Sequence, residues 1–149
     1  MSPSAAAAVL EYPASRYRAE APPDLTSRHE RERLSAPGLK TFFTIAAHWK
    51  LRDEEARALL GGVSNGPFYE MKRNPDRILD ADRLARISYV IGIFKALRIL
   101  HSDHLADEWV RLPNRNAIFT GETPLAYMIR GGLPAMQIVR RLLDARRAG

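Results

Sequence analysis

The chain of 149 residues contains no cysteine, and this absence removes several classes of chemistry at once. Without a thiol there is no disulfide, no thiolate nucleophile and no cysteine-ligated metal. A chain without disulfides suits a reducing compartment, so we expect a cytoplasmic protein. The longest uncharged apolar run covers residues 87–94 and is far shorter than the roughly 20 residues that cross a bilayer. No membrane-spanning helix is expected.

Signatures of catalysis are missing as well. No serine lies in a nucleophile-elbow pattern, and no glycine-rich loop has the spacing that binds phosphate. The pairs Gly61-Gly62 and Gly131-Gly132 each follow an apolar helical turn, so helix termination explains them. His101 and His104 lie three residues apart, but no second group of ligands accompanies them. The sequence therefore predicts a protein that is not an enzyme and that uses no metal and no cofactor.

Acidic charge is in short supply relative to basic charge. Lys and Arg together number 23 against 17 Asp and Glu, which gives a net charge of +6. The excess lies in two separate segments, residues 71–98 with seven basic against three acidic side chains, and residues 130–149 with five against one. This distribution favours an anionic partner, either nucleic acid or an acidic protein surface.

From Pro37 onward the apolar residues recur at helical spacing, and no segment shows the alternation of a strand. The sequence therefore predicts an all-α protein. The expected helices cover residues 37–49, 53–60, 64–73, 80–100, 103–112, 123–131 and from about 134 onward. The helix over 80–100 is apolar on several sides, so we expect it to be the central scaffold.

The first 34 residues differ from the rest of the chain. Four prolines interrupt them, and their apolar residues follow no sustained helical or strand period. We expect residues 1–34 to form a flexible, solvated tail. A short helix over residues 29–34 is the alternative, because the charges there alternate at helical spacing.

The expected helices 53–60 and 64–73 are joined by a short glycine turn, which is the helix-turn-helix pattern. In such a unit the second helix enters the major groove of DNA. Its candidate DNA-contacting residues are Ser64, Asn65, Tyr69, Lys72 and Arg73. The same spacing also fits two helices that only pack together, and Glu70 would bring negative charge near phosphates. Both interpretations stay open at this point.

Four motifs follow in the last 41 residues. They are Trp109-Val-Arg-Leu-Pro-Asn114, Gly121-Glu-Thr-Pro-Leu125, Tyr127-Met-Ile-Arg-Gly-Gly132 and Val139-Arg-Arg-Leu-Leu-Asp-Ala145. In this order they resemble the toxin-binding domain of the Xre/MbcA/ParS-type antitoxins. The region from about residue 39 to 100 is similar to the Xre-like helix-turn-helix domain of the same family. We therefore divide the chain into an N-terminal tail (1–34), an Xre-like helix-turn-helix domain (35–101) and a helical toxin-binding domain (102–149).

The resemblance implies a type II antitoxin. Its expected partner is a RES-domain toxin that degrades NAD or uses NAD to ADP-ribosylate a target, and the antitoxin would occlude the active-site cleft. It also implies promoter DNA as a second partner for autoregulation, and a homodimer within a larger toxin–antitoxin complex. Three positions depart from the family pattern, since glycine is usual where Phe119 and Thr120 stand, and a large aromatic is usual at Met71.

The residues of the toxin-binding region fall into two groups. Helical spacing places the apolar ones in the core, namely Trp109, Leu125, Met128, Val139 and Leu142. The polar ones are the candidates for contact with the toxin, because arginine binds carboxylates with two hydrogen bonds and is enriched at interfaces. They are Asn114, Arg115, Asn116, Arg130, Arg140, Arg141, Arg146 and Arg147. For any one of them a solvated surface position is the alternative.

A different class of function is compatible with the same features. The chain would then be a stand-alone transcriptional regulator that reads DNA through helix 64–73, and its C-terminal domain would only dimerise. A steep dependence of DNA binding on salt, without a co-purifying toxin, would favour this alternative.

Overall fold

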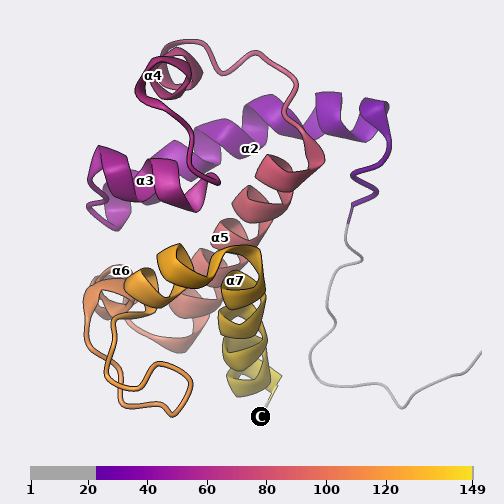
Figure 1. The fold of residues 1–149 in the computed structure, drawn as a ribbon. Coiled ribbons are helices and arrows are strands. Elements are labelled where there is room, and N and C mark those ends of the chain that lie inside the picture. The colour runs from indigo at the N-terminus through magenta and orange to yellow at the C-terminus, as the bar shows by residue number, and fades with distance from the viewer. Residues whose placement is uncertain (1–22, 149) are drawn as a thin grey trace, which may run out of the picture.

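The computed structural model describes residues 23–148, and these residues form helices without any strand. The elements are α2 (Arg28–His48), α3 (Asp53–Leu59), α4 (Asn65–Arg73), α5 (Ala81–Leu100), α6 (Asp103–Glu108), the 3-10 helix η1 (Trp109–Arg111) and α7 (Pro124–Ala148). Figure 1 shows α2, α3 and α4 gathered at one end of the molecule, α6 and α7 at the other, and α5 running between them. The all-α prediction is confirmed. Within 23–148 no helix is long and apolar enough to span a bilayer.

Helix α5 lies at the centre of the core. Asp80 caps it by accepting a hydrogen bond from the Arg83 amide at 2.8 Å. Its buried side chains include Leu84 and Ile93, which the helical repeat of about 3.6 residues places on opposite sides of the helix. Both α2 and α7 pack against it, so more than one side is covered. The prediction of a central scaffold helix is confirmed.

Helix α2 begins at Arg28, nine residues before the position that the sequence predicts, so the assignment of residues 28–34 to a flexible tail is wrong and the alternative of a helix over 29–34 is confirmed. Ser27 caps the helix by accepting from the Glu30 amide at 3.3 Å. Ser35 is fully buried, and its Oγ accepts from the Leu79 amide at 2.9 Å, which ties α2 to the segment before α5. Pro37 lies inside the helix although proline disfavours that position. Residues 1–22 of the expected tail lie outside the described residues.

Helices α3 and α4 form the expected helix-turn-helix. Gly61 and Gly62 follow α3 with φ angles of 98° and 85°, in the left-handed region that favours glycine. Phe68 of α4 is buried and meets the Phe43 ring of α2 at 5.6 Å between centroids. Ser64 precedes α4 as its N-cap residue, but its side chain makes no capping hydrogen bond.

Helix α7 consists of two helical halves joined at Gly132, whose φ and ψ are 66° and −148°. Thr123 caps the first half by accepting from the Ala126 amide at 3.1 Å. A helix that begins at about residue 123 and ends at the glycine pair was predicted. In the second half Val139 faces the core as predicted, whereas its neighbour Ile138 is 39% exposed. In this half of α7 the buried face carries Val139 and residues three and four positions away, and α7 packs against α5.

Gly132 provides a test of the break in α7. Its backbone lies in a region that is almost specific to glycine, so Gly132→Ala is expected to lower the free energy of unfolding by about 1–3 kcal/mol. Chemical denaturation monitored by circular dichroism measures this change. Gly66→Ala in α4 is the control, since an added Cβ meets nothing within 4 Å there. Equal stabilities for the two variants would contradict the expectation.

Candidate functional site

The loop between η1 and α7 is closed by its own backbone. The Asn114 amide donates to the Glu122 carbonyl at 3.1 Å, and the Gly121 amide donates to the Asn114 carbonyl at 3.0 Å. The Asn114 side chain accepts from the Asn116 amide at 2.9 Å, and the Asn116 side chain accepts from the Ile118 amide at 3.1 Å. Both predicted contact residues Asn114 and Asn116 therefore shape the loop with their side-chain oxygens.

Phe119 anchors this loop in the core. Its side chain is fully buried and makes edge-on contacts with Trp109 and Tyr127, at centroid distances of 5.9 and 5.2 Å. Thr120, the next residue, has a φ of 49°, in the left-handed region where a glycine would be unstrained. The two departures from the family pattern in this loop thus have opposite effects on stability, because Phe119 adds buried apolar surface while Thr120 adds backbone strain.

Three of the predicted toxin-contacting arginines are held by carboxylates of the chain. Arg130 pairs with Glu122 across the start of α7. Arg140 and Arg147 both approach Asp144, at 3.0 and 3.8 Å. The Arg140 guanidinium also lies on Gly92 of α5, where an added Cβ would come within 1.4 Å of it. Arg140 thus contacts the neighbouring helix α5, while these ion pairs with Glu122 and Asp144 stay within α7 and the residue two positions before it.

Arg115, Arg141 and Arg146 differ from these three. They are exposed, and within residues 23–148 no hydrogen bond or ion pair engages their guanidinium groups. They lie on the closed loop and on the second half of α7. Of the eight predicted contact residues, these three present the most available positive charge.

A carboxylate that the sequence analysis did not single out joins α3 to η1. Glu55 is only 8% exposed and accepts from the Arg52 amide at 2.9 Å and from Arg111 at 3.0 Å. Burial acts to raise the pKa of Glu55, but the hydrogen bonds from the Arg52 amide, Arg111 and the Arg52 side chain outweigh it and hold the pKa below its ordinary value. Glu55 therefore stays ionised at neutral pH.

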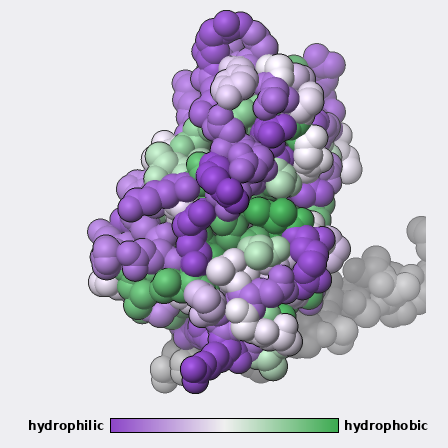
Figure 2. Space-filling view, turned by 60° about the vertical axis from the view of Figure 1, so that its left-hand side comes forward, coloured by the Kyte–Doolittle hydropathy of each residue, from purple (hydrophilic) through white to green (hydrophobic). Residues whose placement is uncertain are grey.

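A pocket opens beside this carboxylate, and we call it the junction pocket. Its volume is about 420 Å³, and it lies between α3 and the first half of α7. The lining residues are Arg52, Glu54, Glu55, Ala58, Arg111, Thr123, Leu125, Ala126, Ile129 and Arg130. Figure 2 shows apolar surface across the middle of the face that carries α3, between more polar surfaces above and below.

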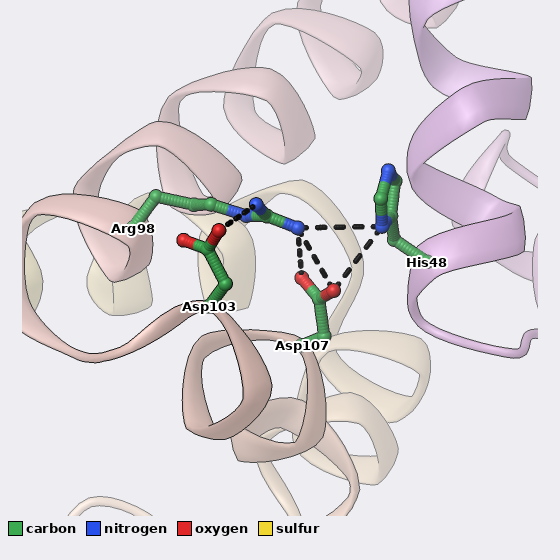
Figure 3. Close-up of polar contacts among 4 residues, drawn as sticks. All are labelled: His48, Arg98, Asp103 and Asp107. Atoms are coloured by element: carbon green, nitrogen blue, oxygen red, sulfur yellow. Dashed lines mark hydrogen bonds and ion pairs between the residues drawn. The ribbon is translucent and has the colours of Figure 1, made fainter.

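A second polar cluster joins α2, α5 and α6 (Figure 3). Asp107 accepts from Arg98 at 2.8 Å and lies 3.1 Å from Nδ1 of His48. Arg98 also pairs with Asp103 at 3.2 Å and stacks over the Phe94 ring at 4.8 Å. Asp103 and Asp107, which lie near His101 and His104 in the sequence, therefore both bind Arg98. In the part of the chain that the structure describes, no group of three or more His, Asp or Glu has a geometry that holds a metal.

The predicted DNA-contacting residues are exposed at the start and on the outer side of α4, and carboxylates engage the polar groups of three of them. The Tyr69 hydroxyl donates to Asp53 at 2.8 Å, and the Lys72 ammonium lies 3.6 Å from the same carboxylate. Arg73 pairs with Glu70. The Tyr69 hydrogen bond is the main cause that lowers the pKa of Asp53, and the same contact raises the pKa of Tyr69.

Ser64 and Asn65 are exposed at the start of α4. They are the predicted DNA-contacting residues that no carboxylate among residues 23–148 engages. Helix α4 thus presents two neutral polar side chains at its beginning and two paired cations toward its end.

Nearly all of the described residues match known protein families. Residues 28–92 match the family described as the antitoxin Xre-like helix-turn-helix domain, and residues 95–149 match the antitoxin Xre/MbcA/ParS C-terminal toxin-binding domain. The chain belongs to the Xre/MbcA/ParS antitoxin family. This antitoxin is also 38% identical to the uncharacterized protein y4oB of Sinorhizobium fredii over 112 residues, which are 74% of this chain and 84% of that protein. No solved structure matches.

Membership of the family gives the two ends of the molecule their general roles. The antitoxin carries a helix-turn-helix domain and a domain that binds a toxin protein. The two family regions meet between residues 92 and 95, inside α5, rather than at a loop. The closed loop, η1 and α7 all belong to the toxin-binding domain.

Glu55 gives a prediction about pH. Since its folded-state pKa is below the ordinary value of 4.5, the ionised carboxylate stabilises the fold above that pH, and the contribution is lost as pH falls through the folded-state pKa. Glu55→Gln is therefore expected to lower the free energy of unfolding by about 1–2 kcal/mol at pH 7, because Arg111 loses its charged partner. The difference from wild type should disappear in acid.

Denaturation at a series of pH values measures this effect. Glu108→Gln is the matched control, because Glu108 pairs with His104 on the surface, where ion pairs contribute little. A Glu55→Gln variant that is as stable as wild type at pH 7 would show that the buried pair is not stabilising.

Proposed function

We propose that the antitoxin neutralises a RES-domain toxin, an enzyme that uses NAD, by covering the entrance to its active-site cleft. The closed loop of residues 112–123 and the second half of α7 are the surfaces that would lie over the cleft. The observation that carries the proposal is the exposed, unpaired positive charge of Arg115, Arg141 and Arg146 on these two segments of the toxin-binding domain.

Electrostatics indicates how these arginines would act. A site that binds the pyrophosphate of NAD needs hydrogen-bond donors and is basic, so it repels arginine. The arginines would instead pair with acidic side chains around the rim of the cleft. Inhibition would then be mainly steric, with the loop and α7 keeping NAD out.

Co-expression with the protein encoded by the neighbouring reading frame tests the proposal. The two chains should co-purify, and the antitoxin should restore growth and the cellular NAD level. Purified antitoxin incubated with NAD alone should show no turnover, in keeping with a protein that is not an enzyme. If there is no complex and no rescue, the stand-alone regulator becomes the better explanation.

The end of α7 gives a residue-level prediction. A chain truncated after Asp144 lacks Arg146 and Arg147, and we expect it to bind the toxin about tenfold or more weakly, as loss of interface arginines commonly does. Binding is measured by titration, and inhibition by NAD consumption. A full-length Arg146→Gln variant separates the loss of charge from the loss of backbone. Unchanged inhibition by the truncated chain would exclude a role for the tail.

We further propose that the helix-turn-helix domain binds the antitoxin's own promoter as a homodimer, with α4 of each copy in the major groove of one half-site. Ser64 and Asn65 are free to reach DNA, whereas Tyr69, Lys72 and Arg73 would have to exchange Asp53 and Glu70 for phosphates. Autoregulation would take place in the cytoplasm, where the promoter and the toxin are both accessible.

Removal of the competing carboxylate should strengthen this interaction. Asp53→Asn is expected to raise promoter affinity about three- to tenfold and to steepen the salt dependence by about one unit, because Lys72 becomes available to phosphate. Electrophoretic mobility shifts at several salt concentrations measure both quantities. Glu108→Gln, which removes a carboxylate from α6, is the control. Unchanged affinity in Asp53→Asn would mean that Lys72 does not contact DNA.

A further inference from the structure

The junction pocket is built by both domains of the antitoxin. Helix α3 of the helix-turn-helix domain contributes Glu54, Glu55 and Ala58, and the toxin-binding domain contributes the lining residues from Arg111 and the first half of α7. The 3.0 Å pair between Glu55 and Arg111 crosses from one domain to the other. The pocket therefore exists only because the two domains are held together.

The floor of the pocket is apolar and accessible. It is formed by the small side chain of Ala58 on one side and by Leu125, Ala126 and Ile129 on the other. Ala126 is exposed and Ile129 half-buried, so no described segment of the chain covers them. A volume of about 420 Å³ lies within the range of about 300–1,000 Å³ that is usual for binding clefts.

The rim of the pocket is rich in guanidinium groups. Arg52 and Arg130 have side chains that are 67% and 65% exposed, Arg111 also lines the pocket, and these three cations outnumber the lining carboxylates of Glu54 and Glu55. A guanidinium has five N–H donors, and the contacts with Glu54, Glu55 and Glu122 use only some of them. Donors remain on the rim for a further carboxylate.

We propose that the junction pocket is a docking site for the toxin, and that its occupant is an apolar side chain of the toxin with a carboxylate beside it. The apolar side chain would fill the floor, and the carboxylate would meet the rim arginines. The toxin thereby contacts α3 of the helix-turn-helix domain as well as the toxin-binding domain. This inference rests on the proposed function, because it specifies where the toxin binds.

Single-cysteine variants test the proposal directly, because the chain has no cysteine of its own. Ala58→Cys places a thiol on the α3 wall of the pocket, and Ala126→Cys places one on the α7 wall. Ala47→Cys, at an exposed position on α2 away from the pocket lining, is the matched control. Each variant is labelled with a maleimide, alone and in complex with the protein from the neighbouring reading frame.

We expect the complex to slow labelling about tenfold or more in both pocket variants and to leave the Ala47→Cys variant unchanged, since interface contacts exclude water. Protection of Ala126→Cys alone would place the toxin on the toxin-binding domain only, and protection of neither would place it elsewhere; each result would overturn the inference while the proposed function stands. If the wild-type chain forms no complex, both are overturned.

A second measurement tests the acidic part of the occupant. Arg130→Gln should speed dissociation of the complex about five- to tenfold and weaken its salt dependence, because one rim charge is lost. Arg28→Gln is the matched control, since Arg28 is also an exposed arginine paired with a glutamate, but on α2. Equal dissociation rates for the two variants would overturn the assignment of a carboxylate to the occupant.

Discussion

The packing of two helices against α5 is the constraint on which the rest of the structure depends. A helix that is covered by α2 along one side and by α7 along another cannot rotate without exposing one of its apolar sides. Because the two family regions meet inside this helix, the helix-turn-helix domain and the toxin-binding domain share one rigid element instead of a linker. The direct contacts from α3 to η1 and from α2 to α6 then add specific polar pairs to an arrangement that burial already determines.

The parts of the fold that the sequence predicted are those with a local signal. Helical periodicity located α5, and a capping threonine with a glycine pair located both ends of the first half of α7. Helix α2 was placed too late because Pro37 is a strong start signal and the preceding residues are mostly polar. What holds that first part is Ser35, whose hydrogen bond to Leu79 spans 44 residues and leaves no periodic pattern in the sequence.

The same distinction separates the predicted contact residues from the observed site. Arginines can be counted in the sequence, but their availability depends on carboxylates that only the fold brings near. Asp144 engages Arg140 and Arg147, while no carboxylate in the described part of the chain engages Arg141, which lies between them in the sequence. Glu55 and Arg111 are 56 residues apart, so neither spacing nor charge runs could have paired them. Arg52 is the N-cap residue of α3, and Glu55 stands three positions after it, as in a capping box. This spacing is the one local signal that could have drawn attention to Glu55.

Helix α3 is seven residues long, and two of its three carboxylates face different neighbours. Asp53 holds Tyr69 and Lys72 of α4, whereas Glu55 holds Arg111 of the toxin-binding domain. A substitution in α3 is therefore pleiotropic, since it perturbs both ends of the molecule together. Related antitoxin loci that diverge within one genome would have little freedom to alter one end of the molecule while preserving the other. Loss of cross-reaction between such paralogous pairs would then evolve through coordinated changes around this single helical turn.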